Sequence, residues 1–330
     1  MPTSPGSSKG PDWRPAASLQ TLRLRADLLA RTRAFFAARG LLEVETPQLS
    51  AAAATDLHLE SLAAAAPGGG LSGWLHTSPE FPMKRLLAAG AGDIWQLARV
   101  FRGAERGRRH NPEFTLLEWY RVGWDAPALM DEVDALLRVL AGDAITAPAR
   151  RTSYRAAFLE HAGFDPCTAG EGEIAGALER GGVSLSAQAG LRRDDLLDLA
   201  LATLVEPAFD PRRPTFVYDF PASHAALARI RPGEPPLAER FELFLGGMEL
   251  ANGFHELTDA DEQAARFRTD LERRRERGLA APPVDARLLA AMAHGLPDCA
   301  GVALGFDRLV MILAGAERID DVLAFPWGIA

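Results

Sequence analysis

A glycine pair that divides one long apolar run is the feature that most constrains the fold. Gly246 and Gly247 lie in the middle of residues 240–256, whose sequence is RFELFLGGMELANGFHE. Two glycines between two strand-like halves are typical of a two-residue hairpin turn, because both turn positions need a positive φ. The segment therefore predicts two antiparallel strands that lie next to each other in a sheet.

The same hairpin predicts a pair of carboxylates on one face. If the turn is regular, Phe244 lies opposite Glu249. In this register Glu242 lies opposite Ala251, so Glu242 and Glu249 are diagonal neighbours at about 7–8 Å. Carboxylates this close repel each other in a partly buried site unless a cation lies between them, and Mg²⁺ prefers oxygen ligands near phosphates. An exposed sheet face is the alternative, which the apolar surroundings disfavour.

Further strand-like runs indicate a larger antiparallel sheet. Residues 93–101 and 113–121 are two such runs, and the polar segment RGAERGRRHNP joins them. Residues 215–223 also alternate, with their aromatic side chains on one face. The sequence therefore predicts strands that are paired through hairpins and long loops.

Helices are predicted in separate segments. Apolar residues at helical spacing predict a helix that starts near Ser18 and ends before Gly40, followed by a short strand that ends at Pro47. A second helix is predicted over residues 259–278, with arginine and glutamate on its solvated face. Strands segregated from helices predict an α+β fold rather than alternating βαβ units.

The chain divides into a tail and one folded domain. Residues 1–17 contain four prolines and few side chains that could pack in a core. We therefore expect this segment to be a disordered tail. Residues 18–330 form the folded domain. Within it, residues 131–212 change to short helices with Gly and Pro breaks, which predicts a helical connecting region.

Composition excludes several classes of protein. The formal net charge of −8 argues against broad capture of nucleic acid by net charge. Cys167 and Cys299 lie far apart, so neither a disulfide framework nor a thiolate metal site is predicted. The N-terminus lacks an apolar signal core, and no apolar run approaches the roughly 20 residues that span a bilayer. These features predict a cytoplasmic protein without membrane contacts.

The loop between the first two strand-like runs is the best candidate for a phosphate site. Its basic residues are Arg102, Arg106, Arg108, Arg109 and His110, in an otherwise acidic protein. Guanidinium groups match phosphate oxygens bidentately, so strand ends that direct several of them to one point could hold a polyphosphate. A solvated turn is the alternative for an arginine-rich loop.

Two further clusters have ordinary explanations when taken alone. TSPE at residues 77–80 precedes a helix that begins near Phe81 and is typical of a helix start. GVALGFDRLVMIL, from residue 301, is a glycine-bearing strand that leads into a helix, where Arg308 could stack on a base or contact a phosphate. Lys84 could serve as a Schiff-base nucleophile, but no predicted pocket selects it.

In combination, these segments resemble the three motifs of class II aminoacyl-tRNA synthetases. The helix–strand unit that ends at Pro47, FRGAERGRRHNPEF and GVALGFDR are similar to motifs one, two and three. The segments HTSPEFPMKRLL, LLEWYR and ELANGFHELTD are similar to the lysine-specific branch. The resemblance extends from about residue 18 to about residue 325. Only a short tail stands where a lysyl-tRNA synthetase has an anticodon-binding OB-fold, so the chain most resembles the free-standing synthetase-like ligases that modify elongation factor P.

This resemblance implies a fold and an activity. The fold is a class II synthetase catalytic core, an antiparallel sheet flanked by helices, in a homodimer with motif one at the interface. The activity is ATP-dependent activation of (R)-β-lysine as an aminoacyl-adenylate and its transfer to a lysine side chain of elongation factor P, with Mg²⁺ and without tRNA binding. A minimal lysyl-tRNA synthetase that uses α-lysine is one alternative, and a non-catalytic paralogue that binds an amino acid or adenylate is another.

The resemblance also implies roles for individual residues. The expected catalytic groups are Arg102 and Arg308. The residues expected at ATP are Arg102, Gly103, Ala104, Glu105, Asn111, Phe114, Glu249, Leu250, Gly305 and Arg308. Those expected at the amino-acid substrate are Ser78, Pro79, Glu80, Tyr120, Glu256 and Ala303. Glu242 and Glu249 are the expected Mg²⁺ ligands, in agreement with the hairpin argument.

Two positions depart from the family pattern. Lysyl-tRNA synthetases have glycine where Ala303 stands, and the added methyl group would narrow the pocket near the α-amine. This favours a substrate whose amino group is on the β carbon. Motif two usually reads Arg-x-Glu, but Ala104 occupies the position of the acid and Glu105 follows it.

Overall fold

The computed structural model describes residues 13–70, 72–103, 106–145, 147–185 and 190–330. Most of the expected tail and both motif-two residues Ala104 and Glu105 therefore lie outside the described residues. The residues just before Ser18 pair with the C-terminal segment. The amides of Ala16 and Ala17 donate hydrogen bonds to the carbonyls of Ala324 (2.9 Å) and Leu323 (3.1 Å).

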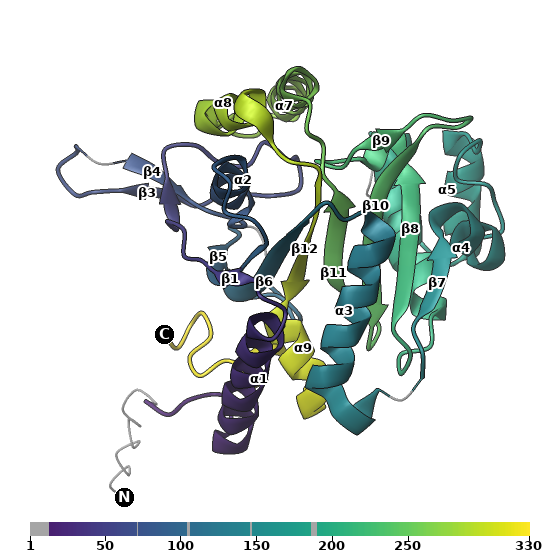
Figure 1. The fold of residues 1–330 in the computed structure, drawn as a ribbon. Helices are drawn as coiled ribbons and strands as arrows, with labels where there is room; N and C mark the ends of the chain where they lie inside the picture. Colours follow the sequence, from purple (N-terminus) through teal and green to yellow (C-terminus); the bar gives the residue numbers. More distant parts are fainter. Residues whose placement is uncertain (1–12, 71, 104–105, 146, 186–189) are drawn as a thin grey trace, which may run out of the picture.

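One large sheet runs through the described part of the chain (Figure 1). Its strand order is β1-β5-β6-β12-β11-β10-β8-β7, and β9 pairs with β10. All pairs are antiparallel except β1 with β5 and β7 with β8. The strands are β1 (Leu42–Glu43), β5 (Ile94–Phe101), β6 (Glu113–Val122), β7 (Arg150–Ser153), β8 (Thr215–Pro221), β9 (Ile230–Arg231), β10 (Leu237–Leu245), β11 (Met248–His255) and β12 (Cys299–Gly305). This architecture confirms the α+β prediction.

Helices flank the sheet in three groups (Figure 1). The first group is α1 (Leu19–Ala37), α3 (Ala126–Ala141) and α9 (Phe306–Ala314), which share the main hydrophobic core with the central strands. The second is α2 (Glu80–Ala88), α7 (Ala260–Glu276) and α8 (Ala286–Gly295), which pack on one another at one end of the sheet. The third is α4 (Tyr154–His161), α5 (Glu171–Arg180) and α6 (Arg193–Ala200), beside β8.

Local sequence accounts for the helix at motif one. Ser18 caps α1 by accepting a hydrogen bond from the Thr21 amide, and Leu28 and Phe36 are fully buried against the core. Gly40 adopts φ +74° just beyond the helix. The predicted strand that follows is only two residues long, although the Val44 amide still donates to the Trp95 carbonyl (2.9 Å). The helix and its end were therefore predictable.

The expected helical connecting region also contributes to the main sheet. Besides α4 to α6, residues 131–212 contain β7, which pairs in parallel with β8. The β7 sequence RRTS lacks apolar alternation, so no strand signal was visible there. A second, small sheet of β2 (Leu49–Ser50), β3 (Ala63–Ala65) and β4 (Ser72–Leu75), in the order β2-β4-β3, extends to the left of α2 in Figure 1.

The two faces of β6 have different functions. Leu117 and Trp119 point into the core, and the alternate residues Phe114, Glu118 and Tyr120 line a cavity on the opposite face.

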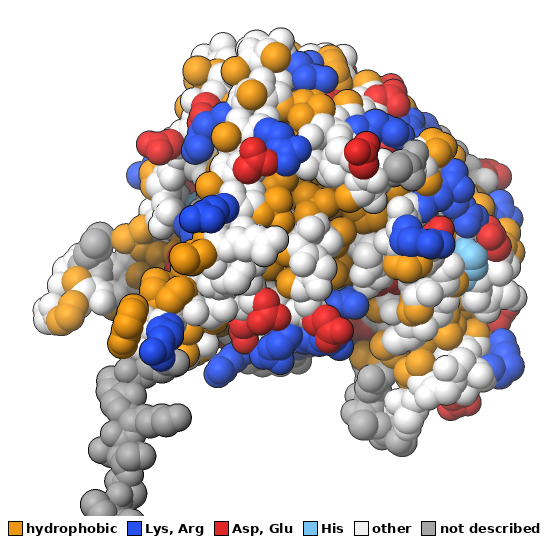
Figure 2. Space-filling view, turned by 90° about the horizontal axis from the view of Figure 1, so that it is seen from below, with side chains coloured by type: hydrophobic (Ala, Val, Ile, Leu, Met, Phe, Trp, Pro, Cys, Tyr) orange, Lys and Arg blue, Asp and Glu red, His pale blue; other side chains and the backbone are white. Residues whose placement is uncertain are grey.

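Charges of both signs lie side by side on the surface seen in Figure 2, where basic side chains stand next to acidic ones. No helix in the described ranges is long and apolar enough to cross a membrane.

Candidate active site

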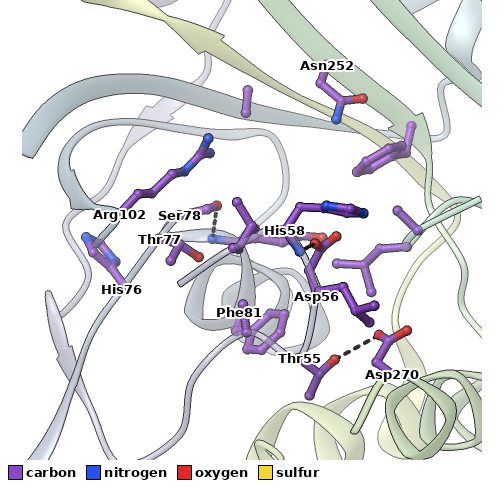
Figure 3. A pocket seen from close by; sticks show the side chains of 18 of the residues that line it. Thr55, Asp56, His58, His76, Thr77, Ser78, Phe81, Arg102, Asn252 and Asp270 are labelled. Atoms are coloured by element: carbon purple, nitrogen blue, oxygen red, sulfur yellow. Dashed lines mark hydrogen bonds between the residues drawn. The ribbon is translucent and has the colours of Figure 1, made fainter. Parts of the chain in front are cut away.

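A cavity of about 1100 Å³ covers the face of the central sheet that is turned away from α1 and α3. Its floor is formed by β6, β10, β11 and β12, and its walls by the start of α2, by α7 and by the loop 51–59. The loop is held in place by Thr55, whose hydroxyl donates to Asp270 of α7 (3.0 Å), as Figure 3 shows. In the same view Ser78, Arg102 and Asn252 lie around the cavity and come from the loop before α2, the loop after β5 and strand β11.

The strand register places four residues in one row across the cavity floor. Glu118 on β6 pairs with Ala303 on β12, and Ala303 pairs with Asn252 on β11. Asn252 pairs in turn with Glu242 on β10. The prediction that Glu242 lies opposite Ala251 is therefore wrong. The Gly246-Gly247 turn places Phe244 opposite Glu249 as expected, but a register shift between Leu243 and Phe244 moves the later pairs by one residue.

Glu118 is the centre of a buried hydrogen-bond network at one end of this row. Its Oε1 accepts a hydrogen bond from the Tyr120 hydroxyl (2.7 Å), and its Oε2 accepts one from the Ser78 hydroxyl (2.7 Å). The Ser78 oxygen also accepts from the Glu80 amide (3.0 Å). Since Glu118 and Tyr120 are both only 2% exposed, the network is shielded from water.

Lys84 joins two further carboxylates at the same end. Its Nζ lies 2.6 Å from Glu80 Oε1 and 2.6 Å from Glu256 Oε2. The side chains of Lys84 and Glu256 are almost completely buried. Glu80 stands in the first turn of α2 and Glu256 directly after β11, so the lysine links a wall of the cavity to its floor beside the acidic pocket. We use this name for the space around Glu80, Glu118, Tyr120 and Glu256.

Burial controls the protonation of this pocket. It raises the pKa of Glu118 to about 8, with repulsion from Glu80 acting in the same direction and hydrogen bonds from Tyr120 and Ser78 opposing it. It raises the pKa of Glu256 to about 7, against the attraction of Lys84. Burial lowers the pKa of Lys84, but attraction to Glu256 and Glu80 outweighs it, so this pKa is raised overall. The acidic pocket thus holds excess acidic groups that a cation would keep ionised.

Gly301 on β12 lets these groups approach the sheet. A Cβ at this position would lie 2.3 Å from Tyr120 Cε1 and 2.5 Å from Glu256 Oε1. Both distances are far below van der Waals contact, so a side chain at residue 301 would displace the tyrosine ring or the carboxylate. The glycine is therefore a steric requirement of the acidic pocket.

Arginine side chains gather at the other end of the cavity. Arg308, in the first turn of α9, donates to the Glu249 carbonyl (2.6 Å) and contacts His110 Nε2 (2.7 Å). Arg102 lies over the Phe114 ring, with its guanidinium carbon 5.0 Å from the ring centroid. Phe114 and Tyr120 are six residues apart on one strand, which at about 3.4 Å per residue separates the two ends of the cavity by about 20 Å. This length suits a ligand with a cationic end and an anionic end.

Asp307 fixes the start of α9 beside β6. This carboxylate is 1% exposed, accepts a hydrogen bond from the Thr115 amide (2.6 Å) and forms an ion pair with Arg25 of α1. Arg308 follows directly in sequence, so its direction into the cavity depends on this anchor.

The predicted arginine cluster divides between the cavity and the protein surface. Arg102, Arg109 and His110 line the cavity, but Arg106 and Arg108 do not. Arg108 instead pairs with Glu317 (2.5 Å). Of the five basic residues in the predicted loop, three therefore line the cavity and two lie outside its lining.

The predicted metal ligands lie near further acidic groups. Glu242 is 7% exposed and pairs with Arg240, and burial raises its pKa to about 8, with repulsion from Glu249 in the same direction. Burial raises the pKa of nearby Glu206 to about 7, again with a contribution from Glu249. Among the described residues, no group of three or more His, Cys, Asp or Glu side chains has metal-ligating geometry. Glu242 and Glu249 therefore fit a Mg²⁺ ion only if phosphate oxygens and water complete its shell, which is the usual mode for this ion.

The remaining predicted residues have mixed placements. Leu250, Gly305, Asn111 and Ala303 line the cavity. The Asn111 side chain donates to the Glu113 carbonyl (2.6 Å) and accepts from the Trp327 amide (2.9 Å), which ties it to the C-terminal segment. Pro79 caps α2 and Gly103 donates its amide to the Glu60 carbonyl (2.8 Å), and neither is part of the cavity lining.

Several site residues were missed by the sequence analysis. Glu118 could have been found, because it stands two residues before Tyr120 in a predicted strand and so shares its face. Asn252 could have been found by the same alternation from Glu242 and the hairpin. The pairing of Lys84 with two carboxylates depends on contacts between α2 and β11 that no sequence spacing reveals.

The chain is similar to known proteins over almost its whole length. A family model described as tRNA synthetases class II (D, K and N) matches residues 10–328. A protein of Vibrio vulnificus named elongation factor P–(R)-beta-lysine ligase is 49% identical over 323 residues, which are 97% of this chain and 99% of that protein. Proteins of the same name from Vibrio cholerae and Yersinia enterocolitica are each 50% identical, over 96% and 97% of this chain and 98% and 99% of theirs.

Proposed function

Because the chain belongs to the class II tRNA synthetase family of the D, K and N type, we propose that it is an ATP-dependent ligase that activates (R)-β-lysine and joins it to a lysine side chain of elongation factor P. The observation that supports this most directly is the composition of the cavity, with a buried acidic pocket at one end and arginines at the other. Relatives with this name are about half identical over nearly the whole chain.

The acidic pocket is suited to a substrate with two ammonium groups. Glu80, Glu118 and Glu256 supply three carboxylates, and Tyr120 and Ser78 orient one of them. A buried ammonium group is costly unless acidic groups pair with it, and a buried carboxylate is costly unless a cation does. Binding of the substrate therefore pairs its ammonium groups with the carboxylates of the pocket, which offsets the cost of burying either charge alone.

The first step forms an aminoacyl-adenylate. A carboxylate oxygen of the amino acid attacks the α-phosphorus of ATP, the bond to the β-phosphate breaks, and pyrophosphate leaves with the electron pair. Arg102 and Arg308 stand at the arginine end, where guanidinium groups stabilise the negative charge that develops on the phosphate. Catalysis then depends on position and charge, so no protein nucleophile is required.

The second step transfers the acyl group. An unprotonated amine of the acceptor lysine attacks the carbonyl carbon, the bond to the AMP oxygen breaks, and the amine loses a proton as the amide forms. AMP leaves with the electron pair of the broken bond. The products are therefore a modified acceptor, AMP and the pyrophosphate of the first step.

Glu242 and Glu249 are the residues that would hold Mg²⁺. Two carboxylates and phosphate oxygens together match the ligands that this ion prefers. The ion supplies a positive charge that neutralises the phosphates of ATP. Arg240, which pairs with Glu242, keeps that carboxylate in place on β10.

Ala303 is the proposed specificity residue. It lies between Glu118 and Asn252 in the row across the cavity floor. Its methyl group takes up space where glycine would leave room for an α-amine, which favours an amino group on the β carbon.

A cytoplasmic homodimer is the proposed form of the protein. The motif-one region exposes large apolar side chains, with Leu19 68% and Leu42 55% exposed. Motif one is the interface that the family resemblance implies, and these exposed side chains would be covered there by the second chain. Sedimentation of the purified protein tests this arrangement through its mass.

ATP–pyrophosphate exchange with the purified protein tests the proposed function. We expect the fastest exchange with (R)-β-lysine, compared with (S)-β-lysine and α-lysine, and a matching mass gain of added elongation factor P. Exchange with α-lysine together with charging of tRNA would assign a minimal lysyl-tRNA synthetase instead. The absence of exchange with all three amino acids would indicate a paralogue that only binds.

A further inference from the structure

Lys84 is a buried lysine with an unusual position. The chain contains only two lysines, Lys9 and Lys84. Lys84 is 2% exposed and lies between the Glu80 and Glu256 carboxylates, which are themselves expected at the substrate. A buried cation that pairs with two carboxylates of a cation-binding pocket needs a physical explanation.

The groups around Lys84 show that it is outnumbered by acids. Glu80 faces it from α2 and Glu256 from the end of β11, each at 2.6 Å. Beyond them β6 contributes Glu118 and Tyr120, and β12 contributes Cys299, whose thiol pKa is raised by burial and by Glu256. The apolar side chains that α7 and α8 contribute to the adjoining core include Phe267, Leu288 and Met292. Three carboxylates thus share one internal cation.

We propose that Lys84 is a positioning residue that completes the acidic pocket by holding Glu80 and Glu256 ionised and in place, so that three carboxylates are balanced by Lys84 and the two ammonium groups of the substrate. This inference rests on the proposed function, since it needs a substrate with two ammonium groups. It adds a residue that does not contact the reacting atoms but sets the charge that the pocket offers.

Geometry favours this role over simple packing. Lys84 lies on α2 and pairs with Glu256, which directly follows β11, so it links a wall of the cavity to the end of a floor strand. Without its ammonium group, Glu80 and Glu256 would face each other in a buried space and repel each other. Like charges in such a site are relieved by uptake of a proton, which would remove one of the charges that bind the substrate.

The Lys84→Met variant tests the proposal by enzyme kinetics. We expect KM for (R)-β-lysine in pyrophosphate exchange to rise by about 10-fold or more, with a smaller change in kcat, because a charged hydrogen-bonded partner is lost. We also expect the acid limb of kcat/KM to move to higher pH by about one unit or more, because a neighbouring cation normally lowers a carboxyl pKa by 1–3 units. Lys84→Arg retains the charge and should retain the acid limb.

A matched variant separates charge from packing. Leu87 lies one turn further along α2 and is 2% exposed, so Leu87→Ala weakens the same helix without changing any charge. We expect Leu87→Ala to lower the melting temperature and leave the acid limb in place. If Lys84→Met has the wild-type KM and acid limb, or if Leu87→Ala moves the limb equally, the proposal is overturned. Because wild-type exchange is measured in parallel, a failure of the proposed function is recognised separately by the absence of exchange in the wild type.

The scarcity of lysine allows a second test on the wild-type protein, which applies even if Lys84→Met does not fold. Protein labelled with [¹³Cε]lysine gives two side-chain NMR signals, and Lys9→Arg assigns them. We expect the Lys84 signal to respond to a carboxyl titration near pH 7, where burial places the pKa of Glu256, and to shift when (R)-β-lysine binds. A Lys84 signal that behaves like that of a solvated lysine and ignores the substrate would overturn the proposal.

Discussion

The close approach of Tyr120 and Glu256 to Gly301 leads to a prediction with a built-in control. In Gly301→Ala the new Cβ would lie 2.3 Å from the tyrosine ring and 2.5 Å from the Glu256 carboxylate. One of these groups must move, and overpacking of this kind costs about 1–3 kcal/mol of stability. The displaced group also loses its position at the substrate ammonium, where one charged hydrogen bond contributes about 1.5–3 kcal/mol.

Gly253→Ala is the control with the same steric cost on the other face of the sheet. A Cβ there would lie 2.4 Å from Phe241 Cζ, in the main core and away from the cavity. We expect urea denaturation to show similar losses for both variants. Only Gly301→Ala should also lower kcat/KM for (R)-β-lysine in pyrophosphate exchange, by about 10- to 150-fold. This range is the contribution of one charged hydrogen bond, about 1.5–3 kcal/mol, converted at 1.4 kcal/mol per factor of ten. At Gly172 on α5, an added Cβ would have no neighbouring atom within 4 Å, so Gly172→Ala should lower neither the stability nor kcat/KM.

Two results would refute this reasoning. If Gly301→Ala loses stability but retains full kcat/KM, Tyr120 and Glu256 do not hold the substrate in the arrangement described. If Gly253→Ala loses as much activity as Gly301→Ala, the effect comes from general distortion of the sheet.

Three further predictions concern charged residues. Asp307→Asn should cost about 3–5 kcal/mol in urea denaturation because it leaves Arg25 without its buried partner, whereas Asp320→Asn in an exposed pair should cost less than about 1 kcal/mol. Glu249→Lys should abolish pyrophosphate exchange at every Mg²⁺ concentration, and unchanged exchange would exclude Glu249 as a metal ligand. Because burial raises the pKa of Glu118 to about 8 from 4.5, the folded protein binds more protons than the unfolded chain in this range, so substrate-free stability should fall as pH rises from 4.5 to about 8. Glu118→Gln should flatten that slope, and an equally steep slope in this variant would contradict the cause.

Much of the fold could be predicted because its signals are local. Ser18 and Gly40 mark the ends of α1, and Gly246-Gly247 marks the hairpin between β10 and β11. The short strand β7 could not be predicted, because its polar sequence becomes a strand only through its pairing with β8. Local sequence therefore specifies the elements that carry their own turns and caps, but not those that depend on a partner.

The site was predictable to the extent that strand alternation determines it. Glu118 and Tyr120 share a face because they are two residues apart on β6, and both line the cavity. The register shift next to Phe244 could not be seen in advance, since an extra residue in one strand leaves no mark in the pattern of apolar residues. The contacts of Arg108 with Glu317 and of Lys84 with Glu256 join segments that are far apart in sequence, so only the folded chain reveals them.

The ion pairs of Lys84 also protect the enzyme from its own intermediate. An aminoacyl-adenylate acylates free amines, and the Lys84 amine is paired with Glu80 and Glu256, both of which line the cavity. Held between Glu80 and Glu256, it stays protonated and offers no lone pair to the activated carbonyl. Self-acylation is thereby suppressed at Lys84, in a chain where only two of the 36 lysine and arginine residues are lysine. The acyl group is left for an amine that arrives from another molecule.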